Sequence, residues 1–143
     1  KIRFPYIPGF RAYRELPAML EAFHKLEFKP DVVFIKGHGT AHERFGLASH
    51  FGYSVNTPSV GVANKLSFGE VKGDDIVITG KKVGKVVVTK EGAKPLYVSP
   101  GHGISIKSAV ELVKRFVIQP HKLPEPLMLA HKYAKRIAEE TGF

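Results

Sequence analysis

The sequence predicts a mixed α/β fold in a single domain that covers residues 1–143. Two apolar segments rich in β-branched residues predict buried strands, and segments with an apolar residue every three or four positions predict amphipathic helices. A later stretch of short apolar runs separated by glycine turns predicts an antiparallel meander. The order helix, strand, helix, strand, meander, helix, helix is typical of a sheet flanked by helices.

The first segment is expected to be an extended arm followed by a helix. Residues 1–10 contain two prolines and a glycine, which exclude a helix and predict a turn at Pro8-Gly9. The apolar spacing in Leu16–Leu26 is close to 3.6 and predicts an amphipathic helix. We expect this helix to begin near Glu15, with Pro17 tolerated in its first turn.

Two short strands and a helix are expected next. The run Asp31–Ile35 predicts a buried strand, which stops at the glycine-flanked turn Gly37–Gly39. A short helix is expected over Glu43–Phe51. Ser59–Ala63 predicts a second strand, and the glycine at its centre, Gly61, indicates close approach by another element.

The second half of the chain is expected to form the meander and two helices. The meander strands are expected at Ile76–Ile78, Val83–Thr89 and Pro95–Val98. A break is expected at Gly101–Gly103. The helices are expected at Ile104–Val117 and Leu127–Glu139, and the last one has a basic exposed face.

Composition limits the partners of the chain. Net charge is +9, from 22 Lys+Arg against 13 Asp+Glu, which favours an anionic partner, foremost nucleic acid. The alternative is a basic surface without such a partner. No apolar run approaches the roughly 20 residues that cross a bilayer, so no membrane partner is expected. The lack of cysteine fits a cytoplasmic location. Because residue 1 is lysine, we expect a trimmed or partial translation product.

Three kinds of chemistry are disfavoured by spacing. His38 and His42 are four residues apart, but flanking glycines disfavour a helix that would present both to a metal ion. The serine and histidine pairs lack a Gly-x-Ser-x-Gly elbow for a hydrolase nucleophile. Gly80–Lys85 lacks the spacing of a phosphate loop, and remains either a basic turn that contacts a phosphate backbone or a solvated one.

Carboxylates suited to nuclease chemistry are few. Such chemistry requires two or more carboxylates that converge on divalent ions. Glu15 follows Arg14, so it is a candidate acid beside a candidate phosphate ligand. The alternative is that Glu15 is a charge favoured by the positive end of a helix dipole.

Four blocks, in this order, resemble the endonuclease V family: PYIPGFRAYREL, IKGHGTAHERFGLASHFG, PSVGVANKL and SPGHGIS. The resemblance implies a ribonuclease H-like mixed sheet flanked by helices. It also implies binding to DNA or RNA that contains a deaminated base, hypoxanthine or inosine. The activity implied is Mg²⁺-dependent hydrolysis of a nearby phosphodiester bond, as in DNA repair.

The resemblance implies a strand-separating wedge and a pocket for the extruded base. A rigid, proline-bracketed aromatic side chain can replace stacking lost when a base leaves the helix. The matching wedge residues are Tyr6, Ile7 and Pro8, and the positions around the base are Gly9, Gly37 and His42.

The resemblance also implies a catalytic set. Glu15 matches a metal-binding carboxylate, and His102 lies in the matching late motif. Arg14 and Lys65 are expected to contact the nucleic-acid backbone.

The chain departs from the family in this set. Lys36 stands where the family has a metal-binding aspartate, Asn64 where it has a lysine, and Gly103 where an arginine is usual. The family's first strand, which bears an aspartate, would precede Lys1.

These departures have a common electrostatic meaning. With one carboxylate left, a divalent ion would lose most of its ligands, and the Lys36 ammonium would repel it and could pair with Glu15. We hypothesise that Lys36 replaces the metal as a fixed cation, so that the chain binds deaminated nucleic acid with cleavage reduced or lost.

Two alternatives stay open. One is that the chain belongs to an active metal-dependent nuclease whose first strand is missing from this sequence or supplied by a partner. The other is that it is a structural paralogue without nucleic-acid binding. The first strand of a ribonuclease H-like sheet is central, so its absence is expected to expose an edge beside Asp31–Ile35. A second copy, another chain or an upstream segment outside this sequence would complete the sheet there; the alternative is a rearranged monomer.

Overall fold

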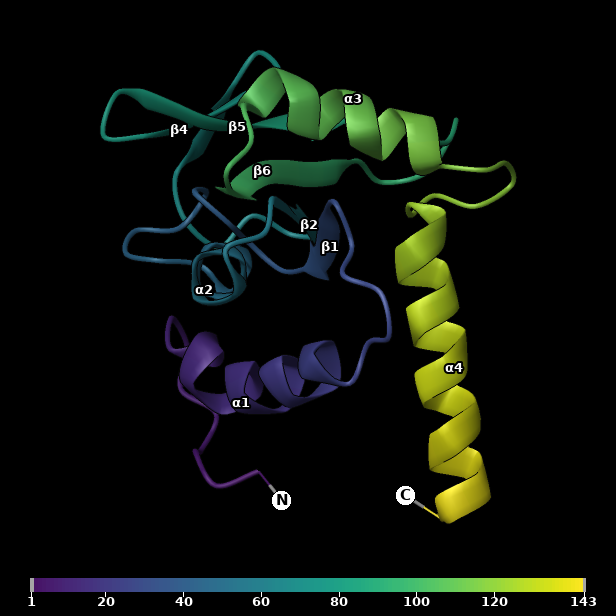
Figure 1. Ribbon diagram of the computed structural model, residues 1–143. Helices are drawn as coiled ribbons and strands as arrows, with labels where there is room; N and C mark the ends of the chain where they lie inside the picture. Colours follow the sequence, from purple (N-terminus) through teal and green to yellow (C-terminus); the bar gives the residue numbers. More distant parts are fainter. Residues whose placement is uncertain (1, 143) are drawn as a thin grey trace.

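Residues 2–142, the part of the chain that the computed structural model describes, form one six-stranded sheet flanked by helices (Figure 1). The elements in chain order are α1 (Arg11–His24), β1 (Val33–Lys36), α2 (Leu47–Val55), β2 (Ser59–Ala63), β3 (Glu70–Lys72), β4 (Asp75–Ile78), β5 (Lys81–Val87), β6 (Leu96–His102), α3 (Ile106–Phe116) and α4 (Glu125–Thr141).

The sheet is mixed, as the sequence predicts. Its strand order is β1-β2-β6-β5-β4-β3; β1 and β2 are parallel, and the other neighbouring pairs are antiparallel. β1 is an edge strand, as expected of Asp31–Ile35, and within residues 2–142 no strand pairs with its outer side. The Ser59–Ala63 strand has its predicted bounds.

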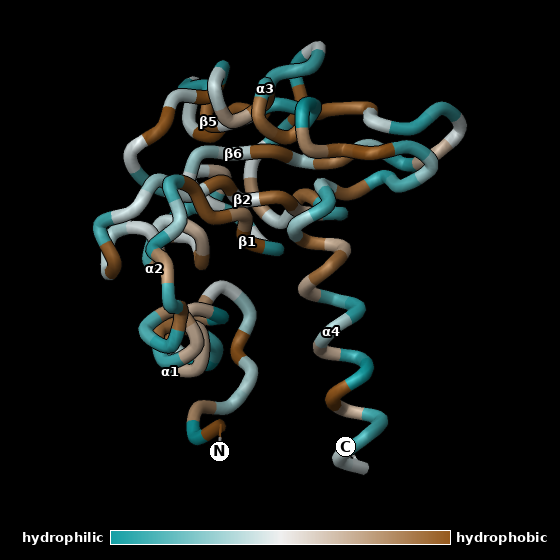
Figure 2. Tube along the Cα trace, turned by 45° about the vertical axis from the view of Figure 1, so that its right-hand side comes forward, coloured by the Kyte–Doolittle hydropathy of each residue, from teal (hydrophilic) through white to brown (hydrophobic). Residues whose placement is uncertain are grey.

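Helices cover both faces of the sheet, and each face has its own hydrophobic core (Figure 1). On one face, α3 packs on β5 and β6, and α4 packs on β1, with Leu127 of its first turn in the same core; Val60, Val98 and Val113 are fully buried there. On the other face, α2 lies on the sheet and α1 packs on α2. In Figure 2 the central strands are largely hydrophobic, whereas hydrophobic and hydrophilic residues alternate along α4.

The prediction that the first helix begins near Glu15 is wrong, because α1 begins at Arg11. Gly9 has a positive φ of +81°, so the chain turns at Pro8-Gly9 and enters the helix at once. Two contacts stabilise the first helical turn: Ala12 is buried against α2, and Arg11 pairs with Glu15 one turn later. Pro17 therefore lies inside the helix.

The second helix also begins later than predicted, at Leu47 and not at Glu43. Gly46 explains the delay, because a Cβ at this position would collide with the carbonyl oxygens of His38 and Gly39. The backbone N–H of Ala48 donates to the His38 carbonyl over 3.0 Å. The residues before Gly46 are therefore held against the 37–39 turn and cannot continue the helix.

The predicted break at Gly101–Gly103 comes too early, because β6 continues to His102. Antiparallel pairing with β2 continues past Pro100 through a register shift between Ser59 and Val60, and sets His102 opposite Ser59. The chain turns only at Gly103, where φ is +61°. The short exposed strand β3 was not predicted, and α4 begins at Glu125, two residues before the predicted start.

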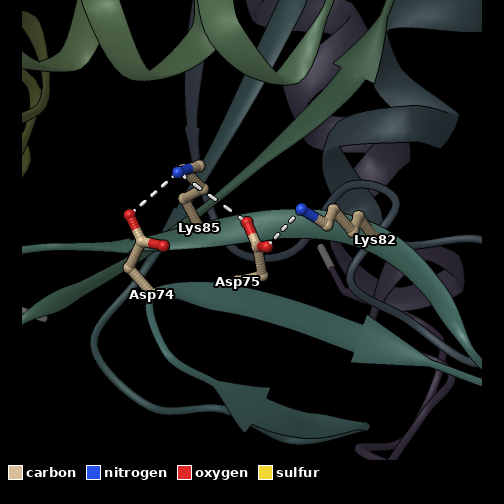
Figure 3. A network of polar contacts seen from close by, with 4 residues as sticks. All are labelled: Asp74, Asp75, Lys82 and Lys85. Atoms are coloured by element: carbon tan, nitrogen blue, oxygen red, sulfur yellow. Dashed lines mark hydrogen bonds and ion pairs between the residues drawn. The ribbon is translucent and has the colours of Figure 1, made fainter.

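The basic turn predicted at Gly80–Lys85 lies in an ion network (Figure 3). Lys82 Nζ lies 2.6 Å from Asp75, and Lys85 Nζ lies 2.8 Å from Asp74 and 3.7 Å from Asp75. The hydrogen bond from Lys85 holds the pKa of Asp74 below its usual value. Because two of the three lysines in this turn already have carboxylate partners, it is the weaker of the chain's candidates for a phosphate contact.

Within the described residues, no helix combines the length and the apolar character that a membrane span requires.

Candidate nucleic-acid interface

The turn that follows β1 lies directly on β2 because residue 61 has no side chain. A Cβ on Gly61 would lie 2.6 Å from the backbone nitrogen of Gly39 and 2.8 Å from the carbonyl oxygen of Gly37. The prediction that Gly61 marks a close approach is therefore confirmed, and the approaching element is the 37–39 turn.

Hydrogen bonds fix the same turn to two strands. Gly37 N donates to the Val62 carbonyl over 3.0 Å, Gly39 N donates to Ser99 Oγ over 2.9 Å, and Thr40 N donates to the Pro100 carbonyl over 2.7 Å. A side chain on Gly39 would collide with the Pro100 carbonyl. The turn is thus a rigid wall at the carboxyl ends of β1 and β2.

A cavity of about 520 Å³ opens beside this wall. It is bounded by the N-terminal arm, the start of α1, the ends of β1 and β2, and the loop before α2. Its lining residues are Tyr6, Pro8, Gly9, Arg11, Ala12, Lys36, Gly37, His38, His42, Phe45, Leu47, Ala63, Asn64, Lys65, Ser67 and Phe68.

The charged side chains that line the cavity are all cationic. Arg11, Lys36 and Lys65 contribute ammonium or guanidinium groups, and no carboxylate is among the lining residues. The Arg11 guanidinium reaches the end of β1, since a Cβ on Gly37 would lie 3.3 Å from its Nη1 atom. Such a cavity favours an anionic ligand.

Two histidines in the cavity are biased toward the neutral form. Burial lowers the pKa of His38, and the charge of His42 adds to this effect. Burial is also the main cause that lowers the pKa of His42. The backbone N–H of Arg44 donates to His42 Nδ1 over 3.0 Å, so the neutral ring of His42 carries its proton on Nε2.

Aromatic rings form part of the lining. The His42 ring packs on Phe68, with centroids 4.5 Å apart and planes 58° apart. Tyr6 has 66% of its surface exposed and Phe45 has 45%. The cavity thus combines fixed cations with apolar ring surface, which is the combination that flat, charged ligands require.

The structure brings most of the predicted pocket residues together. Tyr6, Pro8, Gly9, Gly37 and His42 all line the cavity, as do the three positions Lys36, Asn64 and Lys65. Ile7 is 41% exposed and lies outside the lining.

The predicted catalytic residues are not brought together. Glu15 Oε1 accepts a 2.6 Å bond from Arg11 Nε, so its ion-pair partner is Arg11 and not Lys36. His102 lies opposite Ser59, whereas Lys36 lies opposite Val62, which separates them by about 10 Å along β2. Neither Glu15 nor His102 lines the cavity.

Arg14 has a structural contact. Its Nη1 donates to the Phe4 carbonyl over 2.9 Å and so fastens the N-terminal arm to α1. The arm carries Tyr6, and Arg14 therefore acts on the cavity through the position of the arm.

Sequence reasoning missed several contributors to the cavity, among them Arg11, His38, Phe45 and Phe68. Arg11 could have been found from its spacing of four residues from Glu15. Phe68 comes from the loop after β2, and no local pattern relates it to His42.

The described residues do not fit a divalent ion. They contain no group of three or more His, Asp or Glu side chains placed to hold one. Lys36 adds a positive charge at the strand end, and the Glu15 carboxylate is already paired with Arg11. Such ions require several oxygen ligands, which this site does not bring together.

The fold and cavity together define an α/β protein with a cationic, ring-lined ligand site at the carboxyl ends of two parallel strands. The family model for endonuclease V matches residues 1–132. The chain belongs to the endonuclease V family.

Curated relatives agree with this assignment. Endonuclease V of Thermosipho melanesiensis is 40% identical over 149 residues, which span 98% of this chain and 66% of that protein. Endonuclease V of Dictyoglomus thermophilum is 42% identical over 145 residues, which span 95% of this chain and 63% of that protein. The chain therefore spans just under two thirds of the length of these relatives.

Solved structures have the same fold. Endonuclease V from Streptomyces avermitilis is 32% identical, with a TM-score of 0.88 over 100% of this chain and 66% of that one. Human ENDOV is 28% identical, with a TM-score of 0.87 over 99% of this chain and 70% of that one. Ciona intestinalis endonuclease V was solved in complex with a 24mer DNA containing an inosine followed by a ribo-adenosine. It is 26% identical, with a TM-score of 0.86 over 99% of this chain and 70% of that one.

Proposed function

We propose that this chain binds DNA or RNA at a deaminated base, hypoxanthine or inosine, and that its phosphodiester cleavage is reduced or lost. The observation that carries the proposal is a cavity, in an endonuclease V fold, lined by three cations and no carboxylate. Cations hold phosphates without hydrolysing them, whereas metal-dependent cleavage requires converging carboxylates.

The residues have separate roles in this proposal. Tyr6 and Pro8 of the arm act as the wedge and, with Gly9 and Gly37, bound the extruded base. Lys65 and Arg11 hold phosphate, and Lys36 is the fixed cation at the strand end. Ile7 supports the wedge from outside the cavity.

His42 supports selection of a deaminated base. Its neutral ring presents an Nε2–H donor, because Nδ1 accepts from Arg44 N. Deamination of adenine replaces an amino donor with a carbonyl acceptor. A donor in the cavity therefore favours hypoxanthine over adenine, in which two donors would face each other.

Binding is tested by fluorescence anisotropy with two labelled strands that differ only in one central base, inosine or adenosine. The proposal requires tighter binding of the inosine strand, affinity that falls steeply with salt, and loss of the preference in His42→Ala. Equal, weak binding of both strands would favour a structural paralogue without nucleic-acid binding.

Cleavage is tested with the same inosine strand in the presence of magnesium or manganese. The proposal requires that the unmodified chain leaves the strand intact under conditions where it binds. Multiple-turnover cleavage would instead support the second candidate, an active Mg²⁺-dependent nuclease, with Glu15 and His102 as catalytic groups.

Two observations keep this second candidate in view: the chain spans just under two thirds of its curated relatives, and β1 has an open edge. In that case a strand from an upstream segment, a partner chain or a second copy completes the sheet and contributes the remaining carboxylate. Mixing the chain with a peptide of the relatives' first strand would then restore cleavage.

Residues 1–143 are proposed to act as a single domain in the cytoplasm. Fractionation of cells that produce the chain tests the location, and a single cooperative unfolding transition tests the domain assignment.

A further inference from the structure

A continuous row of aromatic rings leads away from the cavity over the surface of α1 and α2. It passes from Tyr13 to His50, Phe45, Tyr53 and His102, with centroid separations of 5.9, 4.6, 6.4 and 6.0 Å in that order. The rings are supplied by α1, the loop before α2, α2 itself and the end of β6. We call these five residues the ring row.

The ring row is exposed, which a purely structural cluster would not require. Tyr53 has 70% of its surface exposed, Tyr13 has 57% and Phe45 has 45%. Every contact in the row is edge-to-face, with interplanar angles between 62° and 82°. In such contacts one ring meets its neighbour with its edge, so exposed ring faces are left for an incoming flat group.

Phe45 joins the row to the proposed base pocket, because it lines the cavity and also contacts the rings of His50 and Tyr53. The charge near this junction suits a phosphate backbone. The Arg44 guanidinium lies 4.9 Å from the centre of the Phe10 ring, and Phe10 in turn contacts Tyr13. The chain as a whole carries a net charge of +9.

From this arrangement we infer that the ring row is a stacking surface for unpaired nucleotides that adjoin the base held in the cavity. The inference rests on the proposed function, since it assigns the path of the strand outside the pocket. Exposed rings interleaved with cationic side chains bind single strands with little regard to sequence, because every base has a face to stack. His102 thereby gains a role at the far end of the row.

The sequence offers a direct probe, because the chain contains no tryptophan. In Tyr53→Trp the new indole is the sole such fluorophore, and a base stacked on it quenches its emission. Tyr133→Trp is the matched control, because Tyr133 is 61% exposed on α4 and lies outside the row. We expect a single strand to quench the indole at position 53 and to leave the one at position 133 unchanged.

Affinity gives the second readout, with inosine-containing and adenosine-containing strands of DNA and of RNA. Tyr53→Ala is expected to weaken binding of each strand by about five-fold or more, by the same factor for inosine and adenosine. Tyr53→Phe keeps the ring and is expected to bind as the unmodified chain does. Tyr133→Ala is expected to have no effect.

The outcomes separate the two proposals. The inference that the ring row stacks nucleotides is overturned if a strand does not quench the indole at position 53 and Tyr53→Ala binds like the unmodified chain. If the inosine preference is preserved in that case, the proposed base pocket is still supported. Quenching at position 53 by both strands without any inosine preference overturns the proposed base selection and supports the row. Equal quenching at positions 53 and 133 shows non-specific contact and overturns the row.

Discussion

Arg11 Nε donates to Glu15 Oε1 over 2.6 Å, one turn apart on the first helix. The pair joins the cavity to the carboxylate that the endonuclease V resemblance assigns to a metal ion, because Arg11 lines the cavity and Glu15 does not. The charge of Glu15 is thus partly neutralised before any ligand arrives. Lys36, at the end of β1, places a second cation where the family has an aspartate.

Replacing Lys36 by aspartate is expected to raise magnesium affinity, because it removes a repelling ammonium and adds a carboxylate oxygen. Calorimetric titration before and after the change measures the effect. Lys132→Asp, on exposed α4, changes the net charge by the same amount as Lys36→Asp and is expected to leave the magnesium affinity unchanged. Tight magnesium binding by the unmodified chain would contradict the idea that Lys36 replaces the ion.

Gly61→Ala is expected to lower the free energy of unfolding by about 1–3 kcal/mol, as overpacking does in other interiors. The added methyl would lie within 3 Å of backbone atoms in the 37–39 turn, which cannot move aside as a side-chain end can. Urea titration measures the change. In the matched variant Gly37→Ala the nearest atom is the mobile end of Arg11, at 3.3 Å, so a smaller loss is expected. Equal losses in both variants would count against a tightly seated turn.

Acid is expected to weaken the fold through three histidines. Burial lowers the pKa values of His38, His42 and His50 below the ordinary 6.5. The unfolded chain therefore binds more protons, so this contribution to stability is complete above pH 6.5 and is lost as pH falls below it.

Urea unfolding at a series of pH values tests this dependence. His38→Gln is expected to reduce the slope of stability against pH, because it removes a ring that burial biases toward the neutral form. An unchanged slope in this variant would exclude His38 as a source.

Lys65 and Arg14 are expected to differ in the salt dependence of nucleic-acid binding. Lys65 lines the cavity and is exposed, so Lys65→Ala should reduce the slope of log affinity against log salt by about 0.7 on a single strand. Arg14 donates to the Phe4 carbonyl, so Arg14→Ala should weaken binding through the arm without changing that slope. Equal changes in slope in the two variants would indicate that Arg14 contacts a phosphate, as Lys65 does.

Much of the fold follows from local patterns. Ser59–Ala63 was predicted with its true bounds, because a continuous apolar run in the centre of a sheet is buried on both faces. The start of α2 was not predictable, since it depends on Gly46 meeting the carbonyls of His38 and Gly39. Those contacts connect residues on either side of a loop, and no periodicity encodes them.

The site was predictable where it lies on contiguous sequence. Gly37 and His42 belong to one quoted block and do line the cavity. Phe68 and the ring row are different, because their contacts arise from packing between separate elements. The pairing of Glu15 with Arg11 and not Lys36 was missed for another reason: the helix was expected to begin near Glu15, so Arg11 was not placed one turn before it.

The open edge of β1 has a consequence for any strand that pairs with it. The N–H groups of Val33 and Gly37 already bond to β2 and its flanking residue Pro58, so the backbone of Phe34 and Lys36 faces outward. A strand that sets a lysine or arginine opposite Lys36 would be unfavourable, whereas an acidic residue opposite would be favoured. The same lysine that opposes a metal ion thus makes the edge selective for a strand that brings a carboxylate.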